Sequence, residues 1–448
     1  MAAKMSLFRV NPRILLTSVR CSSQKPQELT EEMRSTVSRF VRDEMIGSGT
    51  ITKFDQEVKV SFCVLVEILG ILIPVPDANY QEDSRTRFGQ HGYPERIRFV
   101  LNPLFSLLFR WSRVEFTCQV EHLRGVGLWR LGFGTFDCLS LYSFPGVAIT
   151  LMLSDAAQMP ILYAGSKTLK EKYVSSLCSK SHLAALAASE SEAGSDLARA
   201  KLSAKDDGSG NYVLDGEKSW VTNCGVAKWA FVLAATDPDA KTGDRYTGFI
   251  VDRDARGVSV GECERTMGLK TLDTRSLILD HVKVPKENIV GKVGDGFPLI
   301  MRAFIRVRAV IAAVACGVQR RCLDEAAKYA AERTTFGHAI IEHEGVNFKL
   351  ADMAQRLEAS RLLAEQAAEK IEADVGDAAY YSSIAKCFSA DSAFKAAADA
   401  VQIFGGNGYS SDFPVEKLLR DATSFKILGG ANEIQRLVIE RQLSKKFS

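Results

Sequence analysis

The sequence predicts an α+β protein with an N-terminal helical domain, a central antiparallel β-domain and a C-terminal four-helix-bundle-like domain. Its 448 residues are enough for two or three domains. Both flanking parts place apolar residues at helical spacing, whereas the middle alternates short β-branched and aromatic runs with turn residues. We therefore expect domains at 28–182, 183–288 and 289–448, after a leader at 1–27.

The composition is that of an ordinary soluble globular protein, with 46% hydrophobic and 25% charged residues. A net charge of +3 is too small to indicate nucleic-acid binding. None of the ten cysteines forms a Cys-x-x-Cys pair, so the sequence shows no zinc or thioredoxin pattern. His338 and His343 are five positions apart, whereas paired helical metal ligands are usually four apart, so we expect no metal.

The leader is basic and contains no acidic residue. Its five basic side chains and its serines are Lys4, Arg9, Arg13, Arg20, Lys25, Ser6, Ser18, Ser22 and Ser23. This composition is typical of a mitochondrial transit peptide, with a disordered basic tail as the alternative. Arg9, Pro12 and Arg13 would interrupt the apolar core of a secretory signal. We therefore expect the protein in the mitochondrial matrix.

The first domain is predicted to contain a helix over 28–47 and two more over 146–180, with a break at 164–166. Residues 57–125 fit this pattern poorly and form a divergent segment. Their apolar run at 58–75 only just reaches the ~18–20 residues that cross a bilayer and is interrupted by Lys59, Ser61 and, in its middle, Glu67, so we expect no membrane span.

The β-domain is predicted from several short apolar runs. Residues 212–214 and 219–222 flank Asp215 and Gly216, a pair that favours a tight hairpin turn. Further strands are expected at 231–233, 248–251 and 277–279.

The last domain is predicted to be helical from about residue 297. Leu350, Met353, Ala354 and Leu357 follow the i, i+3, i+4, i+7 spacing of an amphipathic helix. Residues 378–404 and 428–444 show the same spacing, and several consecutive helices favour a bundle.

Five short motifs follow one another in this frame. They are Ser-Glu-Ser-Glu-Ala-Gly-Ser-Asp at 189–196, Trp-Val-Thr-Asn at 220–223, Arg-Thr-Thr-Phe-Gly at 333–337, Gln-Ile-Phe-Gly-Gly-Asn-Gly at 402–408 and Leu-Gly-Gly-Ala-Asn-Glu-Ile-Gln-Arg at 428–436. Each is weak alone: Ala-Gly-Ser-Asp suits a β-turn, the tryptophan suits a strand in the core, and Gly-Gly-x-Gly suits a helix end.

In this order the motifs resemble the acyl-CoA dehydrogenase family, and its medium-chain branch most closely, over roughly the last two thirds of the chain. The resemblance implies FAD-dependent α,β-dehydrogenation of a fatty acyl-CoA in mitochondrial β-oxidation. It also implies electron-transferring flavoprotein as the electron acceptor and a homo-oligomer built as a dimer of dimers.

The resemblance also implies a set of FAD contacts, with Trp220 beside the isoalloxazine ring and Thr222 on its N5. Arginine can bind a pyrophosphate with two hydrogen bonds, and glycines let backbone N–H groups approach it. In the family, the motifs at 333–337 and 402–408 are expected from different subunits. The implied FAD residues are Leu186, Ser189, Ser195, Trp220, Thr222, Arg333, Thr335, Phe336, His343, Gln402, Gly405, Gly406, Gly430 and Asn432.

The implied substrate contacts are Ser195, Arg308 and the backbone of Gly429. Most branches of the family have a catalytic glutamate at the position of Gly429, and others have it at the position of Val307. Neither residue can accept a proton, so no catalytic residue is assigned, although Glu433 is a nearby carboxylate. Two interpretations stay open: a dehydrogenase whose activity is in doubt, or an inactive acyl-CoA- and FAD-binding homologue that acts as an assembly or interaction protein.

Overall fold

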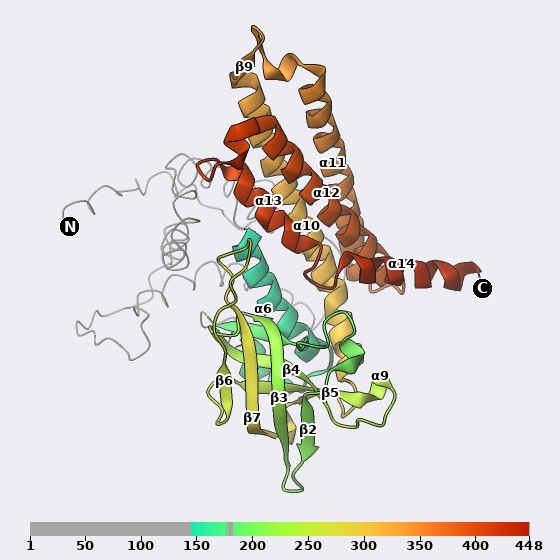
Figure 1. Cartoon of the computed structure of the whole chain (residues 1–448). Helices are drawn as coiled ribbons and strands as arrows, with labels where there is room; N and C mark the ends of the chain where they lie inside the picture. Colours follow the sequence, from blue (N-terminus) through green and yellow to red (C-terminus); the bar gives the residue numbers. More distant parts are fainter. Residues whose placement is uncertain (1–144, 176, 178–181, 448) are drawn as a thin grey trace, which may run out of the picture.

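The computed structural model describes residues 145–175, 177 and 182–447. The predicted leader, the helix at 28–47 and the segment at 57–125 lie outside these residues. Within them the chain is mixed α+β, with a sheet near one end and a long helical bundle at the other (Figure 1).

The described part begins with helix α6, Pro145–Ala164. The predicted break at 164–166 is confirmed, because a short α-turn, α7 Lys167–Leu169, and a π-turn, η3 Lys170–Val174, follow. Ser166 starts this second segment by accepting a hydrogen bond from the Leu169 N–H at 3.2 Å. By length and composition α6 could cross a membrane, but about two thirds of its apolar window is buried, where it packs on β1 and on the long helix of the bundle.

The central sheet has eight strands in the order β6-β7-β3-β2-β4-β5-β8, with β1 beside β4. Most neighbours are antiparallel, as predicted, but β4 pairs in parallel with both β1 and β2. The strands are β1 Leu183–Ala187, β2 Ser203–Asp206, β3 Asn211–Thr222, β4 Ala227–Ala235, β5 Tyr246–Asp252, β6 Val258–Val260, β7 Thr274–Pro285 and β8 Ile289–Val290. The short elements among them are η4 Leu197–Arg199, α9 Thr242–Arg245 and η5 Lys286–Asn288.

The hairpin predicted at Asp215-Gly216 is wrong. Strand β3 continues through both residues and pairs with β7 along its length, with a register shift between Leu214 and Gly216. Gly216 has a φ of 135°, and an added Cβ would lie 3.1 Å from Leu202, so this glycine forms a β-bulge. The real hairpin turn precedes β3, where the Asp207 carboxylate accepts the N–H groups of Ser209 and Asn211.

The helical region confirms the predicted bundle. Met353 and Leu357 of the predicted apolar stripe are buried, and the helix at 378–404 is confirmed. The helix predicted from 428 begins at Asn432, because Gly429 and Gly430 adopt φ values of 67° and 92°. The elements are α10 Gly296–Glu332, β9 Thr334–Thr335, β10 His338–Ala339, η6 Ile340–Glu342, α11 Glu344–Glu372, α12 Ala378–Phe404, η7 Gly405–Tyr409, α13 Pro414–Phe425 and α14 Asn432–Phe447.

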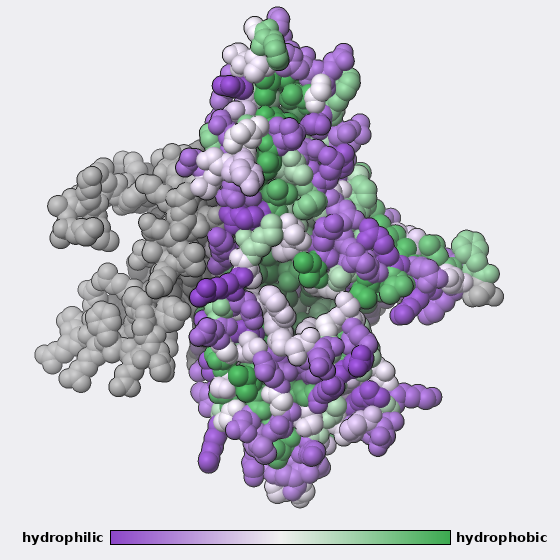
Figure 2. Space-filling model, in the orientation of Figure 1, coloured by the Kyte–Doolittle hydropathy of each residue, from purple (hydrophilic) through white to green (hydrophobic). Residues whose placement is uncertain are grey.

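Helix α10 is the axis of the described structure. It packs on α6, α11 and α12, and it runs from the sheet to the far tip of the bundle, where β9 and β10 lie (Figure 1). With 37 residues it spans roughly 55 Å, given the rise of an α-helix. On the face drawn in Figure 2, apolar side chains gather between the bundle and the sheet.

Candidate functional site

The tryptophan of the second motif is not a core residue. Trp220 has a φ of 57° at an irregular step of β3, and 63% of its surface is exposed. Trp229, on β4, is the buried tryptophan of this sheet, at 1% exposure. An indole held in solvent by an uncommon backbone conformation is available to cover a planar ligand.

Thr222 ends β3 and is almost completely buried. Its hydroxyl lies 3.2 Å from the hydroxyl of Thr274 on β7. If Thr274 donates this bond, the Thr222 proton remains available for an acceptor outside the sheet. The pair therefore allows Thr222 to act as a hydrogen-bond donor, as the resemblance implies.

The first motif lies beside the second. The carbonyl of Ser189 accepts the Ser219 N–H at 2.9 Å. The fully buried Lys218 donates to the Ala188 carbonyl at 2.9 Å and to the Glu190 carboxylate at 2.8 Å. These bonds place two segments about thirty residues apart in sequence side by side in the sheet.

The other implied residues of this edge differ in exposure. Ser195 is exposed in the loop after β1, and Leu186 is half-buried within β1, opposite Phe231 of β4.

The third motif forms the tip of the bundle. Arg333 ends α10 and is exposed, and Phe336 is 94% exposed with a φ of 53°. The Thr335 hydroxyl lies 3.2 Å from Nε2 of His343, whose ring also meets the ring of Phe336 edge-on. The tip thus presents a free guanidinium group and an aromatic face to solvent.

The fourth motif lies at the same tip. Gln402 is exposed near the end of α12, and added Cβ atoms at Gly405 and Gly406 would meet nothing within 4 Å. Asn407 donates to the Tyr329 hydroxyl at 3.0 Å, one turn before Arg333. The third and fourth motifs are therefore neighbours within one chain. This arrangement does not support the expectation that the two motifs reach one cofactor from different subunits.

The residues implied for FAD fall into two groups. One group, around Trp220 and Thr222, lies at the sheet, and the other, around Arg333 and Gly405, lies at the tip of the bundle, where α10 ends (Figure 1). Gly430 and Asn432 belong to neither group, because they lie in the turn that precedes α14.

The two positions at which the family has its base meet in space. An added Cβ at Gly429 would lie 2.5 Å from Cδ1 of Ile311 and 3.0 Å from Cγ1 of Val307. Both of these side chains are buried on α10, at 0% and 1% exposure. The place of the base is therefore filled by aliphatic carbon, and Ile311 was not identified from the sequence.

The backbone at this position is still polar. The N–H of Gly429 donates to no partner among the described residues. A free N–H beside aliphatic side chains can donate to the carbonyl oxygen of a bound ligand.

Arg308 follows Val307 and is buried, at 7% exposure. Its Nη1 donates to the Ser383 hydroxyl at 3.4 Å, while its Nε has no partner among the described residues. Burial lowers the pKa of this guanidinium group to about 10. The described residues supply it with no carboxylate within ion-pair distance, so a ligand anion would be a favourable partner.

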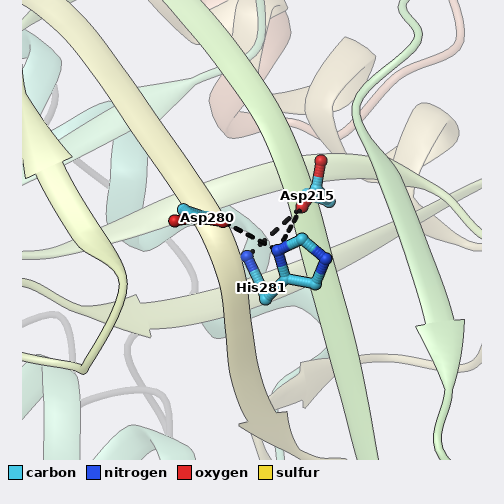
Figure 3. A group of neighbouring side chains, drawn as sticks. All are labelled: Asp215, Asp280 and His281. Carbon is cyan, nitrogen blue, oxygen red and sulfur yellow. Dashed lines mark hydrogen bonds and ion pairs between the residues drawn. The ribbon is translucent and has the colours of Figure 1, made fainter.

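A second charged group lies on the surface of the sheet, where β3 and β7 pair (Figure 3). Nδ1 of His281 is 2.7 Å from the Asp280 carboxylate and 3.0 Å from that of Asp215, and all three side chains are exposed. The hydrogen bond that His281 donates to the Asp280 carboxylate and the charge of Asp215 raise the pKa of His281. An ion pair explains this group, which includes none of the predicted site residues.

Local sequence pattern does not reveal the buried polar residues that hold the turn before α14. Lys386 on α12 is fully buried and donates to Gly430 and Asn432. A lysine among the apolar and small residues of 385–390 is the signal that could have identified it, because an unpaired lysine is rarely buried.

Comparisons with known proteins support the family resemblance. The family model described as "Acyl-CoA dehydrogenase, middle domain" matches residues 185–282, and the model described as "Acyl-CoA dehydrogenase, C-terminal domain" matches residues 294–444. The chain is 40% identical over 285 residues to the probable acyl-CoA dehydrogenase fadE25 of Mycobacterium leprae, which covers 64% of this chain and 73% of that protein. It is 39% identical over 304 residues to the probable medium-chain specific acyl-CoA dehydrogenase 2, mitochondrial, of Caenorhabditis briggsae, which covers 67% of this chain and 73% of that protein.

Solved structures show the same likeness. Butyryl-CoA dehydrogenase from Megasphaera elsdenii superposes with a TM-score of 0.78 at 28% identity, over 94% of this chain and 100% of that one. A glutaryl-coenzyme A dehydrogenase in complex with glutaryl-CoA gives a TM-score of 0.76 at 27% identity, over 94% and 96% of the two chains.

Proposed function

This chain belongs to the acyl-CoA dehydrogenase family, and we propose that it binds FAD and a fatty acyl-CoA but dehydrogenates the acyl chain slowly or not at all. The observation that carries the proposal is the contact of Gly429 with Ile311 and Val307, which puts aliphatic carbon where the family has its base. Losing a general base typically costs ~10²–10⁴-fold in rate.

The rest of the substrate site supports binding. The Gly429 N–H is free to donate to a thioester carbonyl, which would acidify the Cα–H bond of the substrate. Arg308 offers a buried positive charge, and Ser195 offers an exposed hydroxyl. Neither Gly429 nor Val307, the two positions of the family's base, supplies a carboxylate to accept the acidified Cα proton.

The residues that would hold FAD fit such a group. Exposed rings at Trp220 and Phe336, a free guanidinium at Arg333 and the open surface at Gly405 and Gly406 suit a cofactor with flat rings and a pyrophosphate. FAD supplies a hydride acceptor in this family's reaction. The chain's part is to cover the flavin with Trp220, to donate a hydrogen bond from Thr222 and to bind the phosphates at the tip.

We propose that the functional unit is a homo-oligomer, a dimer of dimers. The sheet-side residues and the tip residues are separated within one chain, because the tip lies at the end of α10 remote from the sheet (Figure 1). A second copy of the chain would supply the tip that completes the FAD site. Electron-transferring flavoprotein is the proposed electron acceptor, and a solved structure titled for such a protein has a TM-score of 0.75 with this chain.

The proposed location is the mitochondrial matrix. The acid-free basic segment at 1–27 is typical of a transit peptide, and the Caenorhabditis briggsae relative is named as mitochondrial.

A second candidate function is that of an assembly or interaction protein. It is favoured by large exposed side chains, among them Tyr409 at 92%, Phe447 at 88% and Ile427 at 69% exposure. Such residues mark contact surfaces in soluble proteins when they cluster.

The visible spectrum of the purified full chain, with and without octanoyl-CoA under anaerobic conditions, tests the proposal. We expect a flavin band that shifts on addition of acyl-CoA without bleaching. Rapid bleaching would show an active dehydrogenase, and a protein that takes up no FAD would favour the interaction protein.

A further inference from the structure

Lys386 is a buried lysine in the middle of α12 that ends against the turn before α14. Its side chain is fully buried, and its Nζ donates to the Gly430 carbonyl at 2.8 Å, to Oδ1 of Asn432 at 2.9 Å and to the Lys426 carbonyl at 3.3 Å. Three acceptors match the three N–H bonds of an ammonium group. No described carboxylate forms an ion pair with it, so its partners are neutral oxygens of one turn.

The same turn is held from two further sides. Gln435 donates to the Gly430 carbonyl at 3.0 Å, and its Oε1 accepts the Ser383 hydroxyl at 3.1 Å. Asn432, also fully buried, donates to the Cys387 carbonyl and to the Asp391 carboxylate. The segment 426–432 is therefore fixed at both ends, while the N–H of Gly429 between them has no described partner.

The backbone of this turn needs such support. Gly429 and Gly430 both have positive φ, and two consecutive glycines are the most flexible choice the backbone has. In Figure 1 the turn lies against α10, where Gly429 contacts Ile311 and Val307. A small rotation here would change the direction in which the free N–H points.

We propose that Lys386 is a positioning residue of the acyl-CoA site, whose ammonium group holds the 426–432 turn so that the Gly429 N–H polarises the thioester carbonyl. The inference rests on the proposed function and deepens it, since it names the group that keeps thioester recognition intact when the base is absent. Lys386 itself does not touch the substrate.

The charge of Lys386 should depend on pH. Burial lowers its pKa to about 8, helped by the charge of Arg308 on α10 and opposed by Cys387 and Asp391 on its own helix and Glu433 on α14. Lys426, at the end of α13, forms an ion pair with Asp391 at 3.8 Å. A neutral amine has only two N–H bonds, so deprotonation removes one of the three contacts that fix the turn.

The test uses a chromophoric arylacryloyl-CoA, whose absorption moves to longer wavelength when its thioester carbonyl is polarised. With the full FAD-loaded chain we expect a red shift at pH 7 that decreases as the pH rises through about 8. Lys386→Met should bind the probe roughly 10- to 100-fold more weakly at pH 7, as for a lost charged hydrogen bond. It should also show a smaller red shift at saturation, with no step near pH 8.

Lys395→Met is the matched control, because Lys395 lies on the same helix, is exposed and forms an ion pair with Asp399. It should behave as the parent. Amide hydrogen exchange provides a readout without ligand: Lys386→Met should speed exchange in 426–432 and leave the rest of α12 unchanged.

The outcomes separate the two claims. A parent that binds FAD but gives no red shift at any pH would overturn the proposed thioester site, and this inference with it. A parent that shifts the probe equally from pH 7 to 9, or a folded Lys386→Met variant that shifts it as the parent does, would overturn the role of Lys386 alone. The parent's pH profile needs no variant, so a misfolded variant does not prevent the test.

Discussion

Position 429 lacks the family's carboxylate, and Ile311 and Val307 crowd the space that a new side chain would need. Cδ1 of Ile311 lies where the first carbon of a new side chain would go, and the φ of 67° adds strain for any residue other than glycine. Because the obstructing atom is the end of a flexible side chain, shortening that side chain should remove the obstruction.

We therefore expect Gly429→Glu with Ile311→Ala to raise the rate of flavin reduction by octanoyl-CoA at least ~10²-fold over the parent. Gly429→Glu alone should gain less, because Ile311 displaces the new carboxylate. Ile311→Ala is the control and should gain nothing. Stopped-flow bleaching of the flavin band, at equal FAD occupancy, measures the rate of flavin reduction. Val307→Glu tests the second position at which the family has its base. If every carboxylate variant binds acyl-CoA and stays oxidised, the deficit lies elsewhere.

Arg333 tests the phosphate site at the tip. Arg333→Ala should weaken FAD binding by roughly 1–3 kcal/mol, because a charged hydrogen-bonded contact is lost. Arg320→Ala is a suitable control, since Arg320 is also an exposed arginine of α10 but lies more than three turns away. The ratio of flavin to protein absorbance after dialysis reports the loss. Equal retention by Arg333→Ala and the parent would show that this arginine does not hold the cofactor.

Among the elements, the end of β1 depends on the buried pair of Lys218 and Glu190. Removing one partner of a buried ion pair typically costs about 3–5 kcal/mol, so Lys218→Ala should lower the free energy of unfolding by about that amount. Lys205→Ala, at an exposed position of β2, should have little effect. Urea unfolding followed by tryptophan fluorescence makes the comparison, and equal midpoints would contradict this role.

The same pair should respond to acid. Burial would raise the pKa of Glu190, but the charge of Lys218 and hydrogen bonds from Lys218, Lys201 and Leu202 lower it overall. A carboxyl group whose pKa is lower in the folded state stabilises the fold above its ordinary pKa of about 4.5. This contribution is lost as the pH falls below that value, and Glu190→Gln should reduce the loss.

The elements also show what the sequence could predict. Helices with clear apolar spacing, such as the one at 378–404, and strands such as 231–233 were predicted from local pattern. Asp215-Gly216 was misread as a turn because a φ of 135° suits a bulge as well as a hairpin, and only pairing with β7 decides between them. The start of α14 was placed too early, because helical spacing does not reveal two positive φ values.

For the site, the motifs predict Trp220, Thr222 and Gly429, and the structure places the first two motifs side by side in the sheet. Ile311 and Lys386 could not be assigned, because each acts through a residue more than forty positions away in sequence. Long-range packing of this kind leaves no local pattern.

For the whole molecule, the separation of the two FAD-binding groups along α10 implies that assembly and cofactor binding are coupled. A ligand that binds only the assembled state stabilises it by mass action. Removing FAD should therefore shift the protein toward smaller species in sedimentation velocity, and adding FAD should reverse the shift. A chain that is monomeric while fully loaded with FAD would contradict the two-copy site.

The central claim is that the acyl-CoA site polarises a thioester without a base to remove the Cα proton. The most direct test is the exchange of that proton for deuterium in octanoyl-CoA, incubated with the FAD-loaded chain in D₂O and followed by mass spectrometry. Exchange requires a proton acceptor but not hydride transfer, so it isolates the missing step. We predict exchange no faster than in buffer at saturating protein. Rapid protein-dependent exchange would show that another residue serves as the base.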